Sequence, residues 1–247
     1  MRVTTVIFVL SLFAAVAFGE TTITINGKTI RGSESNITVN NGTVIVDGEV
    51  LSGNVVEGSG KLATENRELG NFNELHLNIS ADVTVTAGKK HQCKITADDN
   101  ILPLIFTECS GNELKISAKE SYSSNQKVMI AIETPLLTSA VMNGSGKIDV
   151  TDVTKDQLTL VISGSGDITA KGKVARLTAT INASGDVHAT GLEAERATIT
   201  VNGSGDADVN VTDILGAKIY GSGDITYIGS PSKVHISVTG SGEITKK

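Results

Sequence analysis

Hydrophobic and polar residues alternate in two short runs that recur along the C-terminal half of the chain. Each recurrence contains a four-residue tract, which is Gly-Ser-Gly together with the residue before it. The six copies begin at Asn143, Ser163, Asn182, Asn202, Tyr220 and Thr239. In the third copy Ala183 replaces the first glycine. The steps between copies are 20, 19, 20, 18 and 19 residues. A fixed period near 20 residues is typical of a solenoid, in which each repeat buries its apolar side against its neighbours.

Apolar residues stand in phase on both sides of the tract. Immediately before it come Met142, Ile162, Ile181, Val201, Ile219 and Val238, and two residues further back Ala140, Leu160, Ala179, Ile199, Ala217 and Ile236. After the tract come Ile148, Ile168, Val187, Ala207, Ile225 and Ile244. The positions between them are mostly polar, so each repeat is predicted to carry two short strands with one face inward. At ~3.3 Å per residue the coil perimeter is ~60 Å, which favours a parallel β-helix.

The second glycine of the tract is present in every copy, at Gly146, Gly166, Gly185, Gly205, Gly223 and Gly242. The first glycine is replaced once, by Ala183. We therefore expect the second glycine to be the site of positive φ or of close approach between coils.

Upstream of the repeats the pattern is less regular. Residues 20–56 contain Asn26-Gly27, Asn41-Gly42 and Asp47-Gly48 between short apolar runs, which predicts β-hairpins that lead into or cap the solenoid. Residues 57–142 read as strands, with a short helical turn or bulge near Pro103. The expected fold is all-β: a single-domain parallel β-helix over residues 57–247, regular from 139 to 247, with an N-terminal β-hairpin segment.

Residues 1–19 are predicted to be a signal peptide. Arg2 precedes an apolar run from Val6 to Phe18, and small residues stand at Ala17 and Gly19. The run is shorter than the ~20 apolar residues that a membrane-spanning helix needs. We expect a mature chain without a membrane span, located outside the cell or in the cell envelope.

The net charge and the aromatic content argue against nucleic acid as a partner. The net charge is −6, which gives no basic footprint for nucleic acid, and the chain has no Trp and only eight Tyr and Phe residues to stack on sugars or bases. No motif for a cofactor is present, and we expect none.

Two cysteines, Cys93 and Cys109, stand in phase with apolar neighbours. An exported chain permits a disulfide between them, but the spacing does not show whether the two Cα atoms are close enough. The alternative is two small buried hydrophobic side chains.

An acidic residue follows the tract in five copies, at Asp167, Asp186, Asp206, Asp224 and Glu243, with Lys147 in the first. Stacked coils would place these carboxylates ~4.8 Å apart. Ca²⁺ could relieve their repulsion, because it favours carboxylate oxygens. The interpretation that we favour is that each carboxylate accepts backbone N–H bonds in its own turn and faces water, so that no metal is required.

Two further functions, ice binding and catalysis, have less support in the sequence. Thr178, Thr180, Thr198 and Thr200 would share one outer face, as an ice-binding surface requires, but Thr is also a good strand residue. Enzyme activity has little support, because the tract serines have no fixed His partner and only Arg176 and Arg196 lie in the repeats. We expect no catalytic residues.

The chain resembles the auto-transporter adhesin family with the head GIN domain, from about Gly58 to Thr245. The likeness rests on the Gly-Ser-Gly-Asp array together with the following segments: Glu74-Leu-His-Leu-Asn-Ile-Ser-Ala-Asp-Val-Thr-Val, Ala97-Asp-Asp-Asn-Ile-Leu-Pro-Leu-Ile, Asn112-Glu-Leu-Lys-Ile and Tyr227-Ile-Gly-Ser-Pro. The resemblance implies a secreted or envelope-associated β-solenoid with no active site to carry over.

These observations together predict a binding or structural protein that contacts a surface ligand, either a glycan or a protein. The alternatives are a polysaccharide lyase or hydrolase on the same fold, and an ice-binding or calcium-binding solenoid. We expect a mostly monomeric protein whose self-association, where it occurs, is end to end. Lys246 and Lys247 would discourage such stacking.

Overall fold

The structure is a computed structural model that describes residues 55–247 in full and, before them, six strands. The chain divides into two compact units, Met1–Glu57 with Glu120–Ser123, and Gly58–Lys119 with Ser124–Lys247. Among the described residues no helix is long and apolar enough to span a membrane.

The first unit contains short paired strands. They are β1 (Thr4–Ile7), β2 (Thr21–Ile25), β3 (Lys28–Gly32), β4 (Ile37–Asn40), β5 (Thr43–Val46), β6 (Glu49–Val50), β7 (Val56–Glu57) and β14 (Tyr122–Ser123). β2 pairs with β3, and β4 with β5, in the antiparallel register that hairpins require. The Asn-Gly turns that predicted these hairpins lie outside the described residues. So does the predicted signal peptide apart from β1, and it stays a prediction.

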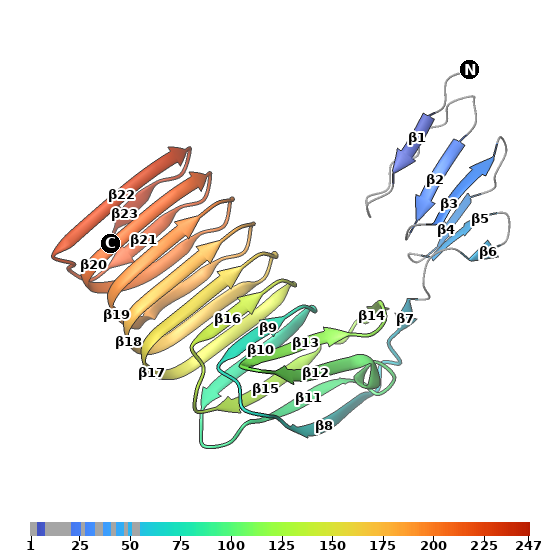
Figure 1. Ribbon diagram of the computed structural model, residues 1–247, viewed down its shortest axis with the longest axis horizontal. Coiled ribbons are helices and arrows are strands. Elements are labelled where there is room, and N and C mark those ends of the chain that lie inside the picture. The colour runs from blue at the N-terminus through green and yellow to red at the C-terminus, as the bar shows by residue number, and fades with distance from the viewer. Residues whose placement is uncertain are drawn as a thin grey trace. The chain divides into compact units, whose positions relative to one another are not determined.

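The second unit holds the solenoid (Figure 1). Its elements are β8 (Leu62–Glu68), β9 (Glu74–Leu77), β10 (Ala81–Ala87), β11 (Gln92–Asp98), a 3₁₀ turn η1 (Leu102–Leu104), β12 (Ile105–Ser110), β13 (Glu113–Ala118), β15 (Met129–Thr134), β16 (Ser139–Met142), β17 (Gly146–Ile162), β18 (Asp167–Ile181), β19 (Val187–Val201), β20 (Ala207–Gly221), β21 (Ile225–Ile228), β22 (Lys233–Gly240) and β23 (Ile244–Lys246). The turn at Pro103 is where the sequence predicts it.

The parallel β-helix prediction is confirmed. β17, β18, β19 and β20 pair in parallel and in sequence order, each one coil beyond the last, as Figure 1 shows from yellow to red. Each of these strands is longer than predicted, because the backbone keeps hydrogen bonding around the corner of the coil. The corner appears instead as a register shift, between Val150 and Val153 in the first coil. Asp152 at φ 61° and Gly172 at φ 134° bend the chain there.

The core is a stack of inward-facing files, each running from coil to coil. One file alternates small and large side chains, all 0% exposed: Ala140, Leu160, Ala179, Ile199 and Ala217. A methyl group under a branched side chain lets successive coils interdigitate without voids. Full burial of each large member contributes about 1.5–3 kcal/mol, so a single polar substitution in a file would cost a coil much of its stability.

The two ends of the solenoid differ. At the N-terminal end the pairing becomes antiparallel, with β8 on β11, β11 on β15 and β12 on β13. At the C-terminal end the file positions of β22 are open, and Val234, Ile236 and Val238 are 38%, 53% and 41% exposed. End-to-end association through this surface remains a prediction.

Candidate functional site

The predicted row of acids forms a hydrogen-bonded ladder. Its members are Asp167, Asp186, Asp206, Asp224 and Glu243. The Asp186 N–H donates to Oδ1 of Asp167 at 3.1 Å, and the next three rungs repeat this bond at 2.7 Å each. The carboxylates accept backbone N–H bonds, as expected. The expectation that each donor lies in the same turn is wrong, because the donor lies in the next coil. In the first coil Lys147 stands beside Asp167 in register and forms an ion pair with Asp149 at 2.9 Å.

The ladder replaces a backbone acceptor that the turn removes. The carbonyl of Asp186 accepts from the N–H of Ile168 at 2.9 Å, and that of Asp206 accepts from Val187 at 2.9 Å. Both backbone groups of each rung are therefore paired, one of them through a side chain. Among the described residues no group of three or more His, Cys, Asp or Glu side chains converges as a metal site would require.

The glycines of the tract are needed mainly because the coils approach closely. A Cβ added to Gly185, Gly205 or Gly223 would lie 2.0–2.1 Å from the carbonyl oxygen of the matching glycine one coil earlier. Only Gly146 among the second glycines has a positive φ, at 102°. The first glycine is equally crowded: a Cβ added to Gly203 would lie 2.1 Å from the Ala183 carbonyl oxygen. The space available therefore does not distinguish the first glycine from the second.

The outer face of the coils carries threonines in register. Thr159, Thr178 and Thr198 form one file, and Thr180 and Thr200 form the next. Gly216 and Lys218 end the two files in the following coil. The array is thus two to three coils deep, which is short for a surface that must match an extended ice lattice.

The cysteines are both free thiols, so the disulfide that the sequence left open is not formed in the structure. Cys93 is buried on β11, and burial raises the pKa of its thiol to about 11. The Cys109 thiol on β12 points toward the carbonyl oxygen of Gly70, 3.8 Å away. Burial is the main cause of the raised pKa of the Cys93 thiol, and Cys109 lies near enough to contribute a smaller part of it.

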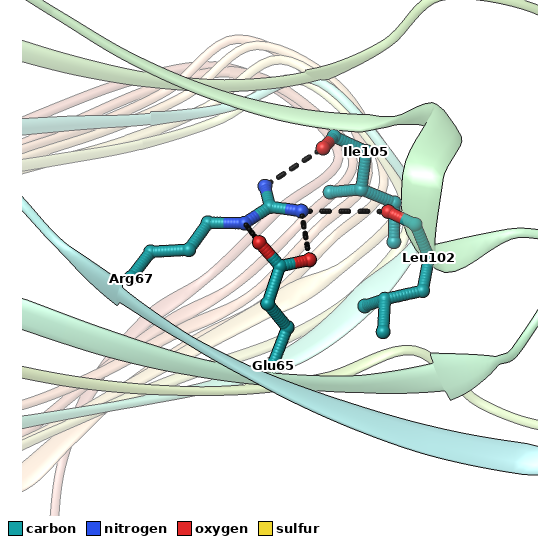
Figure 2. Close-up of polar contacts among 4 residues, drawn as sticks. All are labelled: Glu65, Arg67, Leu102 and Ile105. Carbon is teal, nitrogen blue, oxygen red and sulfur yellow. Dashed lines mark hydrogen bonds and ion pairs between the residues drawn. The ribbon is translucent and has the colours of Figure 1, made fainter.

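Arg67 closes the N-terminal end of the solenoid (Figure 2). Its guanidinium donates to the carbonyl oxygens of Ile105 at 2.7 Å and Leu102 at 3.4 Å. Glu65 binds the same guanidinium through two bonds of 3.0 Å, and this hydrogen bonding lowers the pKa of the Glu65 carboxyl. The Leu102 carbonyl also accepts from the backbone N–H of Ile105, so the pair adds a side-chain bond to a turn that is already closed by its backbone. Its role is structural.

A groove of about 390 Å³ lies where the irregular strands meet the first regular coil. Its floor is apolar, with Val85 from β10, Leu137, and Val150 and Val153 from β17. Lys89, Lys155 and Asp152 stand at its rim, together with several threonines. Concave sites of this size with an apolar floor and a few polar groups are typical of binding sites.

Glu133 holds the loop that carries one of these lysines. Its Oε1 accepts from the backbone N–H groups of Lys89 at 2.9 Å and Lys90 at 3.4 Å, and its Oε2 accepts from Gln92 Nε2 at 2.9 Å. The Lys89 N–H is the main cause of a lowered pKa for the Glu133 carboxyl. The rim of the groove is therefore fixed by a charge-assisted turn.

The sequence reasoning missed this groove. Lys155 occupies the file position that Val174, Ala194 and Val211 fill in the following coils. Those three residues are no more than 1% exposed. A charged residue at an apolar position of the repeat was the signal, and it is visible once the corners of the coils are aligned.

Comparisons with known proteins agree with this architecture. Residues 71–231 match the family model described as "Putative auto-transporter adhesin, head GIN domain". Among curated proteins, none matches the chain. A solved structure of a putative adhesin from Bacteroides fragilis is 24% identical and covers 78% of this chain and 100% of its own, with a TM-score of 0.65. A second, named as a putative lipid binding protein from Parabacteroides distasonis, is 24% identical over 78% and 100%, with a TM-score of 0.51. At these identities the likeness shows the fold alone.

Proposed function

Because the chain belongs to the auto-transporter adhesin family with the head GIN domain, we propose that it is a surface-binding protein of the cell exterior or envelope. It holds a glycan or a protein and carries out no reaction on it. The observation that carries the proposal is the rigid register of the outer face, where exposed and half-buried side chains repeat from coil to coil. Parallel coils ~4.8 Å apart present polar groups at the regular spacing that an extended polymer can follow.

The three acids whose pKa is shifted do not match the general acid of glycoside hydrolysis. A general acid in that reaction needs a carboxyl whose pKa is raised by burial. The shifts found for Glu65, Asp99 and Glu133 all run downward, because hydrogen bonds favour the charged form. The remaining charges on the coils lie mainly in exposed pairs such as Lys173 with Glu193 at 2.7 Å.

The experiment is a binding assay on arrayed glycans and on immobilised extracellular proteins. We expect saturable binding that falls at least tenfold when Thr178→Glu places a charge in the middle of the threonine file. Thr169→Glu is the matched control, because Thr169 lies in the other run of the coil, in register with Asp149 and His188. Release of reducing sugar or unsaturated product from any polysaccharide would replace this proposal with the enzyme alternative.

A further inference from the structure

β17 has an open edge in the middle of its length. On the side of the preceding coil it pairs with β10 as far as Thr151 and with β16 from Thr159 onward. No other strand pairs with it on that side in the part of the chain that the structure describes. On its other side the same stretch is paired with β18 from Val153 to Leu158. An open strand edge presents backbone N–H and C=O groups that can pair with another chain.

The cause of the gap is the change of topology at this coil. β10 ends at Ala87 and the chain crosses to β11 through the loop that Glu133 holds, so β10 does not turn the corner as β17 does. The stretch that leads into β16 covers part of the corner, since the Thr138 carbonyl accepts from the Thr159 N–H at 2.8 Å. The space that remains is the groove described above.

The groove suits a polypeptide better than a lipid chain. The apolar floor is already covered, since Val85, Leu137, Val150 and Val153 are no more than 5% exposed. These four residues therefore offer little further surface to a hydrocarbon chain. What the groove offers is the first half of the open strand edge, Val153 to Lys155, ~10 Å long, and the two rim lysines.

Lys155 supplies the charge that selects the partner. It stands at the start of the file of Val174, Ala194 and Val211, so its aliphatic stem continues an apolar column, and Lys155 is also one of the residues that line the groove. Neither Lys155 nor Lys89 forms an ion pair with any described residue. Asp152 is the one carboxylate in the lining, which therefore keeps a net charge of +1, and a carboxylate on an incoming segment would give Lys155 a partner.

We propose that this groove binds an extended acidic peptide segment, which adds as a strand to the open edge of β17 and places a carboxylate against Lys155. Main-chain hydrogen bonds supply affinity in such strand addition, and the side-chain contact supplies selectivity. The inference goes beyond the proposed binding function, because it adds a second site, apart from the threonine files, with its own partner class.

The test uses the full chain and a fluorescein-labelled, end-blocked peptide, Ser-Thr-Val-Glu-Val-Thr-Ser, followed by fluorescence anisotropy. We expect binding at least tenfold tighter than that of the same peptide with Lys in place of Glu. Lys155→Gln should remove that preference, while Lys218→Gln, which makes the same charge change on β20, should leave it intact. Circular dichroism and a thermal melt check that both variants are folded.

A peptide with alternate N-methylated amides separates strand addition from simple charge attraction, because it keeps the side chains and loses the edge donors. We expect it to lose binding. Equal binding of the N-methylated peptide, no saturable binding of the Glu peptide up to millimolar concentration, or displacement of the peptide by oleate at equimolar amounts would each overturn the proposal. If the peptide does not bind but the protein still binds arrayed glycans or proteins, the groove proposal alone is refuted. The reverse result would refute the surface-binding role.

Discussion

Oδ1 of Asp206 accepts a hydrogen bond of 2.7 Å from the backbone N–H of Asp224, its counterpart one coil along. A side chain here takes the place of a backbone carbonyl in the ladder between coils. The oxygen atom matters for this bond more than the negative charge does.

Asp206→Ala should therefore destabilise the protein, whereas Asp206→Asn should be nearly neutral. The alanine variant leaves the Asp224 N–H without its acceptor, at a cost of about 1–2 kcal/mol. For a chain of this size that lowers the melting temperature by about 2–8 °C. The asparagine variant keeps an acceptor oxygen. Equal losses in the two variants, measured by thermal melting, would show that charge and not the acceptor is what the ladder needs.

Calcium should have little effect on folding. One oxygen of each acid from Asp167 to Asp224 is already engaged by an N–H, which leaves a weak set of ligands for an ion. A ligand of the native state at 100 times its Kd would add about 2.7 kcal/mol. We expect melts in millimolar Ca²⁺ and in chelator to agree within about 2 °C. A rise of about 5 °C or more that disappears in Asp186→Asn with Asp206→Asn would make the ladder a metal site.

Gly205→Ala should be strongly destabilising, by about 3 kcal/mol, because the new Cβ would lie 2.1 Å from the Gly185 carbonyl oxygen and the coils would have to separate. Gly216→Ala is the matched control. Its Cβ would meet nothing nearer than the Ala197 carbonyl oxygen at 3.9 Å, so we expect an unchanged protein or one up to about 1 kcal/mol more stable. Urea unfolding of both variants measures the difference, and similar losses would contradict close approach as the reason for the glycines.

The two thiols should react at very different rates. Cys93 is 2% exposed and its pKa is raised to about 11, so it stays buried and protonated at neutral pH. Cys109 is partly accessible. Treatment of the native protein with N-ethylmaleimide should add one label quickly, at Cys109, and a second only on unfolding. Mass spectrometry of the purified native protein that finds both sites blocked until reduction would show a disulfide instead.

Stability should fall in acid partly through Glu133. Its folded pKa is depressed, so it stays charged in the folded protein at pH values where the unfolded carboxyl, with a pKa of about 4.3, takes up a proton. Its contribution is complete above that value and is lost as pH falls through the lower folded pKa. Glu133→Gln keeps oxygen and nitrogen at the site without the titration. We therefore expect the free energy of unfolding to drop less between pH 5 and pH 3 in the variant than in the native chain. An identical drop in the free energy of unfolding for both proteins would show that Glu133 does not contribute to the loss of stability in acid.

The regular coils could be predicted from the sequence because each contact in them is repeated. The alternation that places Leu160 and Ile199 in one file is local, and the period supplies the register. The N-terminal end could not be predicted in this way. Arg67 meets Ile105 and Leu102 across 38 and 35 residues, and nothing in the local pattern of β8 indicates that its guanidinium ends on those carbonyl groups.

The groove was missed for a different reason. Lys155 looks like an ordinary exposed lysine in a run of polar residues, and only the alignment of coil corners shows that its neighbours in the file are buried. The row of acids and its bonds to backbone N–H groups were predicted, but the coil that donates them was not. The composition indicated carboxylates bonded to N–H groups, but which coil donates depends on the stacking offset, which a single repeat does not contain.

The hydrogen bonds between coils all run along the direction in which the coils stack. Tension applied along that direction loads the outermost rungs first, since each coil contacts only its neighbours. A coil of 18–20 residues is then the mechanical unit, and its release lengthens the chain by roughly 60 Å at ~3.3 Å per residue. A protein of this construction that is pulled while it holds a surface would extend in equal steps, and each step would dissipate work before the next coil carried the load.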